Sequence, residues 1–106
     1  MDKLYLSAYD GFLWDAGNKA KNWEKHKVSI NEIEDVFVNL PLFFFDDLEH
    51  SLAEQRTLVL GKTSGSRLLS IIFTVRYNKI RVISARDMSR MERKTYEENT
   101  EKNSAL

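Results

Sequence analysis

The amino-acid sequence predicts an α+β domain in which two N-terminal helices precede a four- to five-stranded, mainly antiparallel sheet and a C-terminal helix follows it. Two capping boxes, at 29–32 and 89–92, mark helix starts, because a Ser hydroxyl and a Glu carboxylate three residues apart satisfy each other's free backbone amides. Between them, apolar segments of strand length alternate with short turns rich in Gly, Ser and Asn. Short turns of this kind predict antiparallel pairing.

The two N-terminal helices are predicted on either side of Lys27. Asp15 can cap the first helix, which we expect to run to about Lys27. The second helix begins after Ser29, and we expect Pro41 to end it, since proline lacks the amide hydrogen that a helix interior needs. The apolar stripe of this second helix repeats at helical spacing and consists of Ile30, Ile33, Val36 and Phe37.

The sheet is predicted from strand-like segments separated by turn residues. These segments are 12–14, 42–45, 56–62, 67–77 and 79–86. Hairpin turns are expected at 63–66 and 77–79, and the polar segment 46–55 is expected to be a loop. The three segments after this loop should therefore form consecutive antiparallel strands.

Alternation along the two longest strands predicts one apolar and one polar face. The apolar face, which we expect to pack on the helices, carries Leu69, Ile71, Phe73, Val75, Ile83 and Ala85. The opposite face is expected to be open and carries Thr74, Arg76, Ser84 and Arg86. Arg81 has the opposite parity from Arg86, and it can pair with an acidic residue near the edge of the sheet.

The 106 residues fit one domain. We expect 1–11 to form an N-terminal arm, 12–98 to form the domain and 99–106 to form a disordered tail, with the last helix ending at about Glu98. The chain has no cysteine, which excludes a disulfide framework and a cysteine nucleophile. No apolar run has the length of a membrane span and no secretory signal pattern opens the chain, so we expect a cytoplasmic protein without membrane contact.

The formal net charge is zero, but charge is unevenly distributed along the chain. Residues 1–54 contain 5 Lys and Arg against 11 Asp and Glu, whereas residues 55–106 contain 11 against 5. The local field, rather than the net charge, decides whether a polyanion is attracted. The C-terminal half can therefore hold phosphate groups, although an ordinary solvated strand and helix surface would carry the same charges.

Several short motifs share one order and spacing along residues 12 to about 98. They are Phe12-Leu13-Trp14-Asp15, Lys19, Asn22, Lys25-His26, Val28-Ser29, Asp47-Leu48-Glu49-His50, Glu54, Arg56, Gly61, Arg67, Ile80-Arg81-Val82-Ile83-Ser84-Ala85-Arg86, Glu92-Arg93 and Tyr96. Each motif alone is weak, but together they resemble the BrnT family of toxins. The sequence departs from the family pattern at Lys27, where a Gly usually serves as a helix C-cap with positive φ.

The resemblance implies an RNA-cleaving toxin of a type II toxin–antitoxin pair, with a fold like that of the RelE ribonucleases. It implies no cofactor, and a small DNA-binding, BrnA-like antitoxin that masks the toxin and represses their shared operon. A homodimer or a toxin–antitoxin heterotetramer is compatible with this implication.

Metal-free RNA cleavage requires groups that move protons and groups that stabilise charge on phosphorus. For the catalytic steps we select His26, Lys25, Glu54 and Arg86. For RNA phosphate binding we select Arg56, Arg67, Arg76, Arg81 and Lys19. Arg86 is preferred because it ends a strand on the open face and matches the Ser-Ala-Arg motif of the family. The two histidines lack metal-ligand spacing, so no metal site is expected.

Structural interpretations compete with these assignments. His26 can interact with the free carbonyls of a helix end, Glu54 can be merely exposed and His50 can be a solvated loop residue. Phe12, Trp14 and Trp23 are expected to pack in the core rather than to stack on bases. Two further functions stay open: a catalytically degenerate protein that binds an antitoxin and contributes to operon autoregulation, and a general RNA-binding module.

Overall fold

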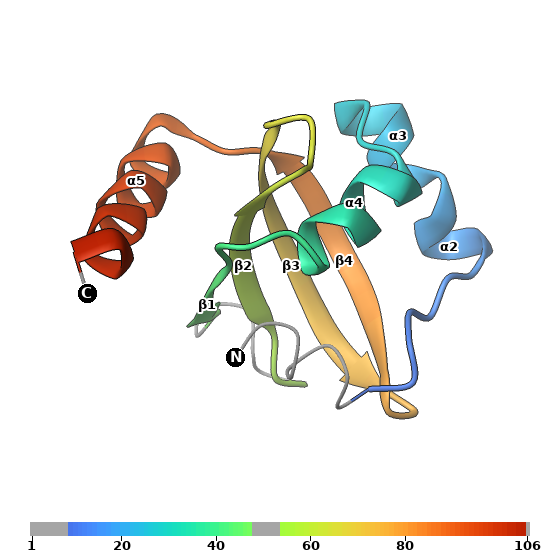
Figure 1. The fold of residues 1–106 in the computed structure, drawn as a ribbon. Coiled ribbons are helices and arrows are strands. Elements are labelled where there is room, and N and C mark those ends of the chain that lie inside the picture. Colours follow the sequence, from blue (N-terminus) through green and yellow to red (C-terminus); the bar gives the residue numbers. More distant parts are fainter. Residues whose placement is uncertain (1–8, 48–53, 106) are drawn as a thin grey trace.

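The computed structural model describes residues 9–47 and 54–105. The helices are α2 (Ala16–Lys19), α3 (Lys21–His26), α4 (Ile30–Phe37) and α5 (Arg90–Ala105), and the strands are β1 (Phe43–Asp46), β2 (Thr57–Lys62), β3 (Leu68–Arg76) and β4 (Lys79–Asp87) (Figure 1). The four strands form one sheet in the order β1-β2-β3-β4, and all neighbours are antiparallel. The predicted α+β class, with helices before and after an antiparallel sheet, is confirmed.

The β3–β4 hairpin contains two features that set where side chains point. Tyr77 and Asn78 form its turn with φ of 54° and 59°, the positive values that a two-residue turn needs to match the strand twist. Ile72 pairs with Ser84 and Phe73 pairs with Val82, so Ile83 is an extra residue in β4. This bulge reverses the alternation along β4. Therefore the expected parity of Arg81 and Ile83 relative to Ala85 is wrong.

The main core lies between α4 and one face of the sheet, which we call the inner face. It contains Val28, Ile33, Val36, Phe37, Leu42, Val59, Leu69, Ile71, Phe73, Ile80, Val82 and Ala85. At Gly61 a Cβ atom would lie 2.5 Å from the Leu42 side chain and 2.7 Å from that of Val36, so only glycine allows this approach. Val75, which was expected on this face, is 40% exposed and lies next to the last residue of β3.

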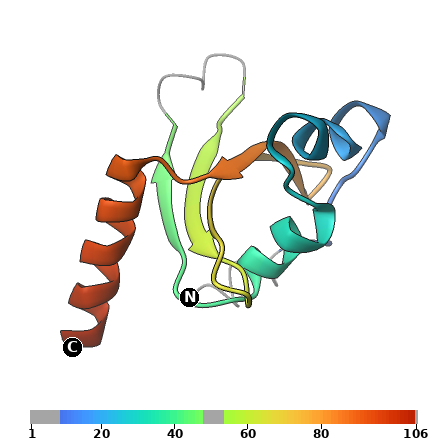
Figure 2. The ribbon, with the colours of Figure 1, turned by 90° about the horizontal axis from the view of Figure 1, so that it is seen from above.

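Among residues 9–47 and 54–105, α5 is the helix that packs on the opposite, outer face of the sheet, and it covers part of that face. Leu60, Met88 and Tyr96 form a second apolar cluster there, and the Tyr96 hydroxyl donates to the carbonyl of Pro41 at 2.9 Å. Figure 2 shows α5 and α4 on opposite sides of the β1–β2 pair. The outer face near β4 therefore stays accessible.

The free edge of β4 is closed by the N-terminal segment. The amide of Ile80 donates to the carbonyl of Gly11 at 2.9 Å, and the amide of Ala85 donates to Oδ1 of Asn22 at 2.9 Å. Nδ2 of Asn18 donates to the carbonyl of Val82 at 3.2 Å. Such coverage prevents the edge strand from pairing with another chain.

Several predicted boundaries are wrong. The segment 12–14 makes a single parallel bridge, between Phe12 and Ile80, rather than a strand. The first helix is broken at Ala20, where hydrogen bonding restarts with the Glu24 amide donating to the Ala20 carbonyl. The second helix ends at Phe37, ahead of Pro41, because the amide of Val38 closes a tighter last turn.

The C-terminal helix is longer than predicted. It runs to Ala105 rather than to about Glu98. The side chains of Asn99 and Thr100 donate to backbone carbonyls four residues earlier, both at 2.8 Å, so these polar residues remain inside the helix.

Candidate active site

The predicted site residues lie at two ends of the sheet. His26, Lys25, Arg67 and Arg86 lie where α3 and β4 end and β3 begins; we call this the upper end. Glu54, Arg56 and Arg76 lie at the opposite, lower end. β3 joins the two ends and spans about 26 Å, at about 3.3 Å per residue. One phosphate group therefore cannot contact both sets.

Arg67 ties three elements together at the upper end. Its Nε and Nη2 donate to Asp87 at 2.8 and 3.2 Å, and its Nη1 donates to Glu32 at 3.1 Å. The carbonyls of His26 and Lys27, at the end of α3, accept from Nη2 and Nη1 at 3.2 and 2.8 Å. All five N–H donors are used, and the hydrogen bonds that the guanidinium donates to Asp87 and Glu32 raise its pKa. This geometry favours a structural role for Arg67.

Lys27 takes the left-handed conformation that the family pattern assigns to glycine. Its φ is 55° and its ψ is 38°, and its amide donates to the carbonyls of Asn22 and Trp23. Its ammonium group lies 5.4 Å from the ring centroid of Trp23, which is 52% exposed. The expectation that Trp23 packs in the core is therefore wrong, whereas Phe12 and Trp14 do pack against the core.

The carboxylate of Asp87 interacts with three cationic side chains at the upper end, those of Arg67, Arg93 and His26. The hydrogen bond from Arg67 is the main cause that lowers the pKa of the Asp87 carboxyl, and it outweighs burial. The charges of Arg93 and His26 lower this pKa further. The structure thus brings His26 and Arg67 together beside Asp87, whereas Arg86, the preceding residue of β4, points to the opposite face of the sheet.

Arg86 points to the outer face and is held by Glu92 of α5. Nη1 donates to Oε1 at 2.7 Å and Nη2 donates to Oε2 at 3.0 Å, and this hydrogen bonding raises the pKa of Arg86. Burial would raise the pKa of Glu92, but the hydrogen bonds from Arg86 and from the Ser89 amide outweigh it and lower it. The Arg86 side chain remains 41% exposed, so part of its guanidinium faces solvent.

The other selected cations of the upper part of the chain and of β4 lie on three different elements. Arg81 binds Asp15 at 2.5 Å, which confirms its expected pairing with an acidic residue near the sheet edge. Because of the bulge in β4, Arg81 shares the outer face with Arg86. Lys19 is exposed in the last turn of α2, and Lys25 is exposed on α3.

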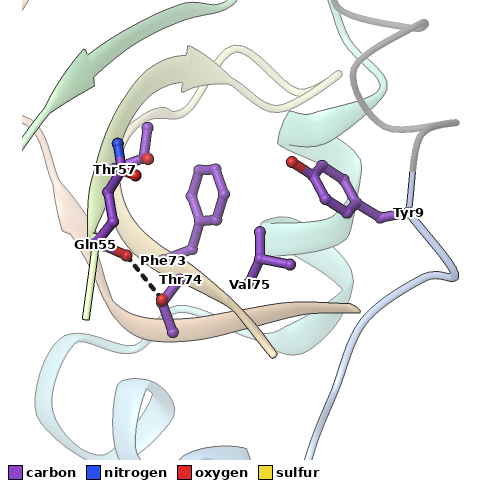
Figure 3. Close-up of a pocket in the computed structure, with 6 residues that line it drawn as sticks. All are labelled: Tyr9, Gln55, Thr57, Phe73, Thr74 and Val75. Carbon is purple, nitrogen blue, oxygen red and sulfur yellow. Dashed lines mark hydrogen bonds between the residues drawn. The ribbon is translucent and has the colours of Figure 1, made fainter. Parts of the chain in front are cut away.

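The lower end contains an ion pair beside a pocket. Arg76 donates to Glu54 at 3.1 Å. The pocket has a volume of about 380 Å³, and Figure 3 shows its lining side chains, which are Tyr9, Gln55, Thr57, Phe73, Thr74 and Val75. The hydroxyl of Thr74 donates to the carbonyl of Gln55 at 2.8 Å, which holds the chain just before β2. Arg56 lies in this part of the chain and is half-buried.

Sequence reasoning did not identify Asp87 and Ser70 as parts of the site, and it assigned Glu92 only to a capping box. Ser70 is buried and donates to Oε2 of Glu92 at 3.1 Å. No spacing in the sequence signals these contacts, because the partners come from β3, β4 and α5. His50 lies outside the described residues.

Within residues 9–47 and 54–105, no three His, Cys, Asp or Glu side chains form a group that could hold a metal ion. In the same part of the chain, every helix is too short or too polar to span a bilayer.

The solved structure of the Brucella abortus ribonuclease toxin BrnT is similar, with a TM-score of 0.55 and 22% sequence identity, and the match covers 76% of this chain and 97% of that chain. At this identity the likeness shows the fold alone. No curated protein matches. A family model described as "Ribonuclease toxin, BrnT, of type II toxin-antitoxin system" matches residues 14–92. Because this match covers most of the sequence, the chain belongs to the BrnT family of ribonuclease toxins of type II toxin–antitoxin systems.

Proposed function

We propose that this chain cleaves RNA without a metal ion, using Arg86 to bind the scissile phosphate and His26 to move a proton. The observation that carries the proposal is the guanidinium of Arg86, which is exposed on the outer face at the end of β4. His26 ends α3 at the same end of the sheet, and its charge acts on the neighbouring Asp87. A cationic fork and an imidazole near one strand end are the groups that this chemistry requires.

In the proposed reaction the 2′-oxygen of the RNA attacks phosphorus and the bond to the 5′-oxygen breaks. One strand then ends in a 2′,3′-cyclic phosphate and the other begins with a 5′-hydroxyl. A base takes the proton of the 2′-hydroxyl, and an acid returns a proton to the leaving 5′-oxygen. We assign one of these proton transfers to His26, with Lys25 beside it. Arg86 offsets the additional negative charge on the phosphate oxygens.

For the other selected residues we propose contacts with RNA away from the cleaved bond. Glu54 and Arg76 lie at the lower end, so we propose that they contact RNA beyond the cleaved bond, together with Arg56. Arg81 and Lys19 can contact phosphates along the β4 side. Because these contacts are electrostatic, they should weaken as salt is added.

We also propose that a small DNA-binding, BrnA-like antitoxin neutralises this chain in the cytoplasm. Membership of a type II toxin–antitoxin family supports such a partner. A homodimer or a toxin–antitoxin heterotetramer is the proposed assembly, and residues 12–98 are the proposed toxin domain.

The test is cleavage of a labelled RNA by the purified protein in EDTA. Arg86→Lys keeps the charge but loses the planar fork, so kcat should fall by about 100-fold. The matched control is Arg90→Lys, an exposed position at the start of α5, which should change kcat by less than about twofold. His26→Ala should lower kcat by about 100-fold, whereas Glu24→Ala on the same helix should not.

Full activity of both Arg86→Lys and His26→Ala would remove the site assignment. If the intact protein binds its antitoxin but never cleaves RNA, the chain is an interaction protein. Salt-dependent RNA binding without cleavage would instead identify an RNA-binding module.

A further inference from the structure

We propose that Glu92 is a positioning residue, whose carboxylate holds the guanidinium of Arg86 so that the opposite edge of that group faces an RNA phosphate. The inference rests on the proposed function, in which Arg86 binds the phosphate. Glu92 itself does not contact the substrate; it acts through Arg86.

The hydrogen bonds of Arg86 divide its guanidinium into two edges. Nη1 donates to Oε1 of Glu92 and to the carbonyl of Asp87, at 2.7 and 3.1 Å, and Nη2 donates to Oε2 of Glu92 at 3.0 Å. These bonds use three of the five N–H donors. The other two, on Nε and Nη2, lie along one edge and have no partner within residues 9–47 and 54–105. Two parallel donors of this kind match two oxygens of a phosphate.

The carboxylate of Glu92 is itself fixed by two further hydrogen bonds. Its Oε1 accepts from the amide of Ser89 at 2.9 Å, as part of the capping box of α5. Its Oε2 accepts from the hydroxyl of Ser70, a buried residue of β3, at 3.1 Å. The side chain of Glu92 is only 18% exposed. Arg86, a long and partly exposed side chain, is thus held in one orientation before any substrate binds.

A carboxylate next to a phosphate-binding arginine could also act as a competitor of the phosphate. The geometry favours positioning, because Glu92 occupies the Nη1–Nη2 edge and leaves the Nε–Nη2 edge open. A phosphate can bind that open edge without displacing Glu92. The two interpretations predict opposite signs for the effect of removing the carboxylate charge.

The decisive variant is Glu92→Gln. Glutamine can still serve the capping box, but its amide N–H₂ would face donors of Arg86, so the paired contact is lost. We expect kcat for RNA cleavage to fall by about tenfold, since hydrogen bonds between charged groups are lost. KM should stay unchanged or fall, because the site becomes more positive.

The matched control is Glu97→Gln, which removes the same charge from an exposed position of the same helix and should leave kcat unchanged. Ser70→Ala keeps the Glu92 charge but removes one of its partners, and it should lower kcat by about threefold. Thermal unfolding of each variant shows whether it is folded at the assay temperature. A parallel loss of kcat and RNA affinity in Glu92→Gln would indicate a merely structural role and would overturn the proposal.

A second readout does not depend on cleavage. The Nε–Hε NMR resonance of Arg86 should shift when a DNA oligonucleotide is added, since DNA lacks the 2′-hydroxyl and stays intact. The shift should be lost in Glu92→Gln and retained in Glu97→Gln. If the three proteins show this pattern of shifts but the wild-type protein never cleaves RNA, the proposed function fails and the positioning role stands. If Glu92→Gln cleaves RNA as fast as or faster than the wild-type protein, the positioning role fails while the function stands.

Discussion

At the scale of single residues, the number of occupied N–H donors separates one arginine from another. Arg67 uses all five donors on Asp87, Glu32 and two backbone carbonyls. Arg86 uses three and keeps one edge on the outer face. The first arrangement stabilises the fold and the second leaves donors for a ligand.

Lys27 offers a residue-scale test of stability. A lysine in the left-handed region costs about 1 kcal/mol relative to a residue without a Cβ atom. We expect Lys27→Gly to raise the free energy of unfolding by about 0.5 kcal/mol, because it also loses the contact with Trp23 and gains backbone freedom in the unfolded state. Chemical denaturation measures this change.

The control is Lys25→Gly, two residues earlier and inside α3, which should lower the free energy of unfolding by about 1 kcal/mol. If both glycines destabilise the protein equally, the left-handed conformation at Lys27 is contradicted.

The sequence predicted where some of the site residues point, but it did not predict the contacts of others. Arg86 was placed on the open face because strand alternation reports which way a side chain points. The acidic partner of Arg81 was also anticipated. The roles of Arg67 and Glu92 were not, because their partners lie on elements that are distant in the sequence and that only tertiary structure brings together.

At the scale of elements, Arg67 joins α4 and the end of β4 through ion pairs and joins both to the end of α3 through hydrogen bonds to its carbonyls. The Ser29 amide is the main cause that lowers the pKa of Glu32, and the hydrogen bond from Arg67 adds to it. The pKa of Asp87 is lowered mainly by Arg67. Both carboxylates therefore stabilise the fold in their charged forms.

These shifts predict how stability depends on pH. A carboxylate whose pKa is lowered by folding contributes its stabilisation above its ordinary pKa, which is 3.8 for Asp87 and 4.5 for Glu32. That contribution is lost as the pH falls through the lowered values. Arg67→Gln should therefore reduce the free energy of unfolding by about 1–2 kcal/mol at pH 7, a range that is modest because Asp87 is 57% exposed.

At pH 3 the difference between Arg67→Gln and the wild-type protein should become smaller. Arg90→Gln, an exposed control on α5, should match the wild type at both pH values. An equal loss at pH 7 and pH 3 would contradict the assigned ion pairs. Denaturation curves at several pH values give the comparison.

The sequence predicted the elements themselves better than their ends. Capping boxes located the starts of α4 and α5, and alternation located β2, β3 and β4. The break at Ala20 was missed because alanine is a strong helix former, so the residue type there gives no sign of a helix end. The bulge at Ile83 was missed because a single extra residue leaves no compositional mark, although it moves Arg81 to the other face.

At the scale of the whole molecule, the predicted site residues separate into two groups at opposite ends of one sheet. The charge bias of the sequence indicated that the C-terminal half could hold phosphate, and β3 and β4 do carry three of the candidate arginines, Arg76, Arg81 and Arg86. The sequence could not show that Glu54 and Arg86 lie at different ends. That separation depends on strand direction and on the length of β3.

The central claim is that RNA is cut by its own 2′-hydroxyl at the Arg86 end of the sheet. Its most direct test is the chemistry of the ends that the purified protein leaves on a short RNA in EDTA. We expect 2′,3′-cyclic phosphate and 5′-hydroxyl ends, loss of cleavage where one deoxynucleotide replaces the ribonucleotide, and about 100-fold slower cleavage by Arg86→Lys. Cleavage that needs an added metal ion, leaves 5′-phosphate ends or proceeds at the deoxynucleotide would contradict it.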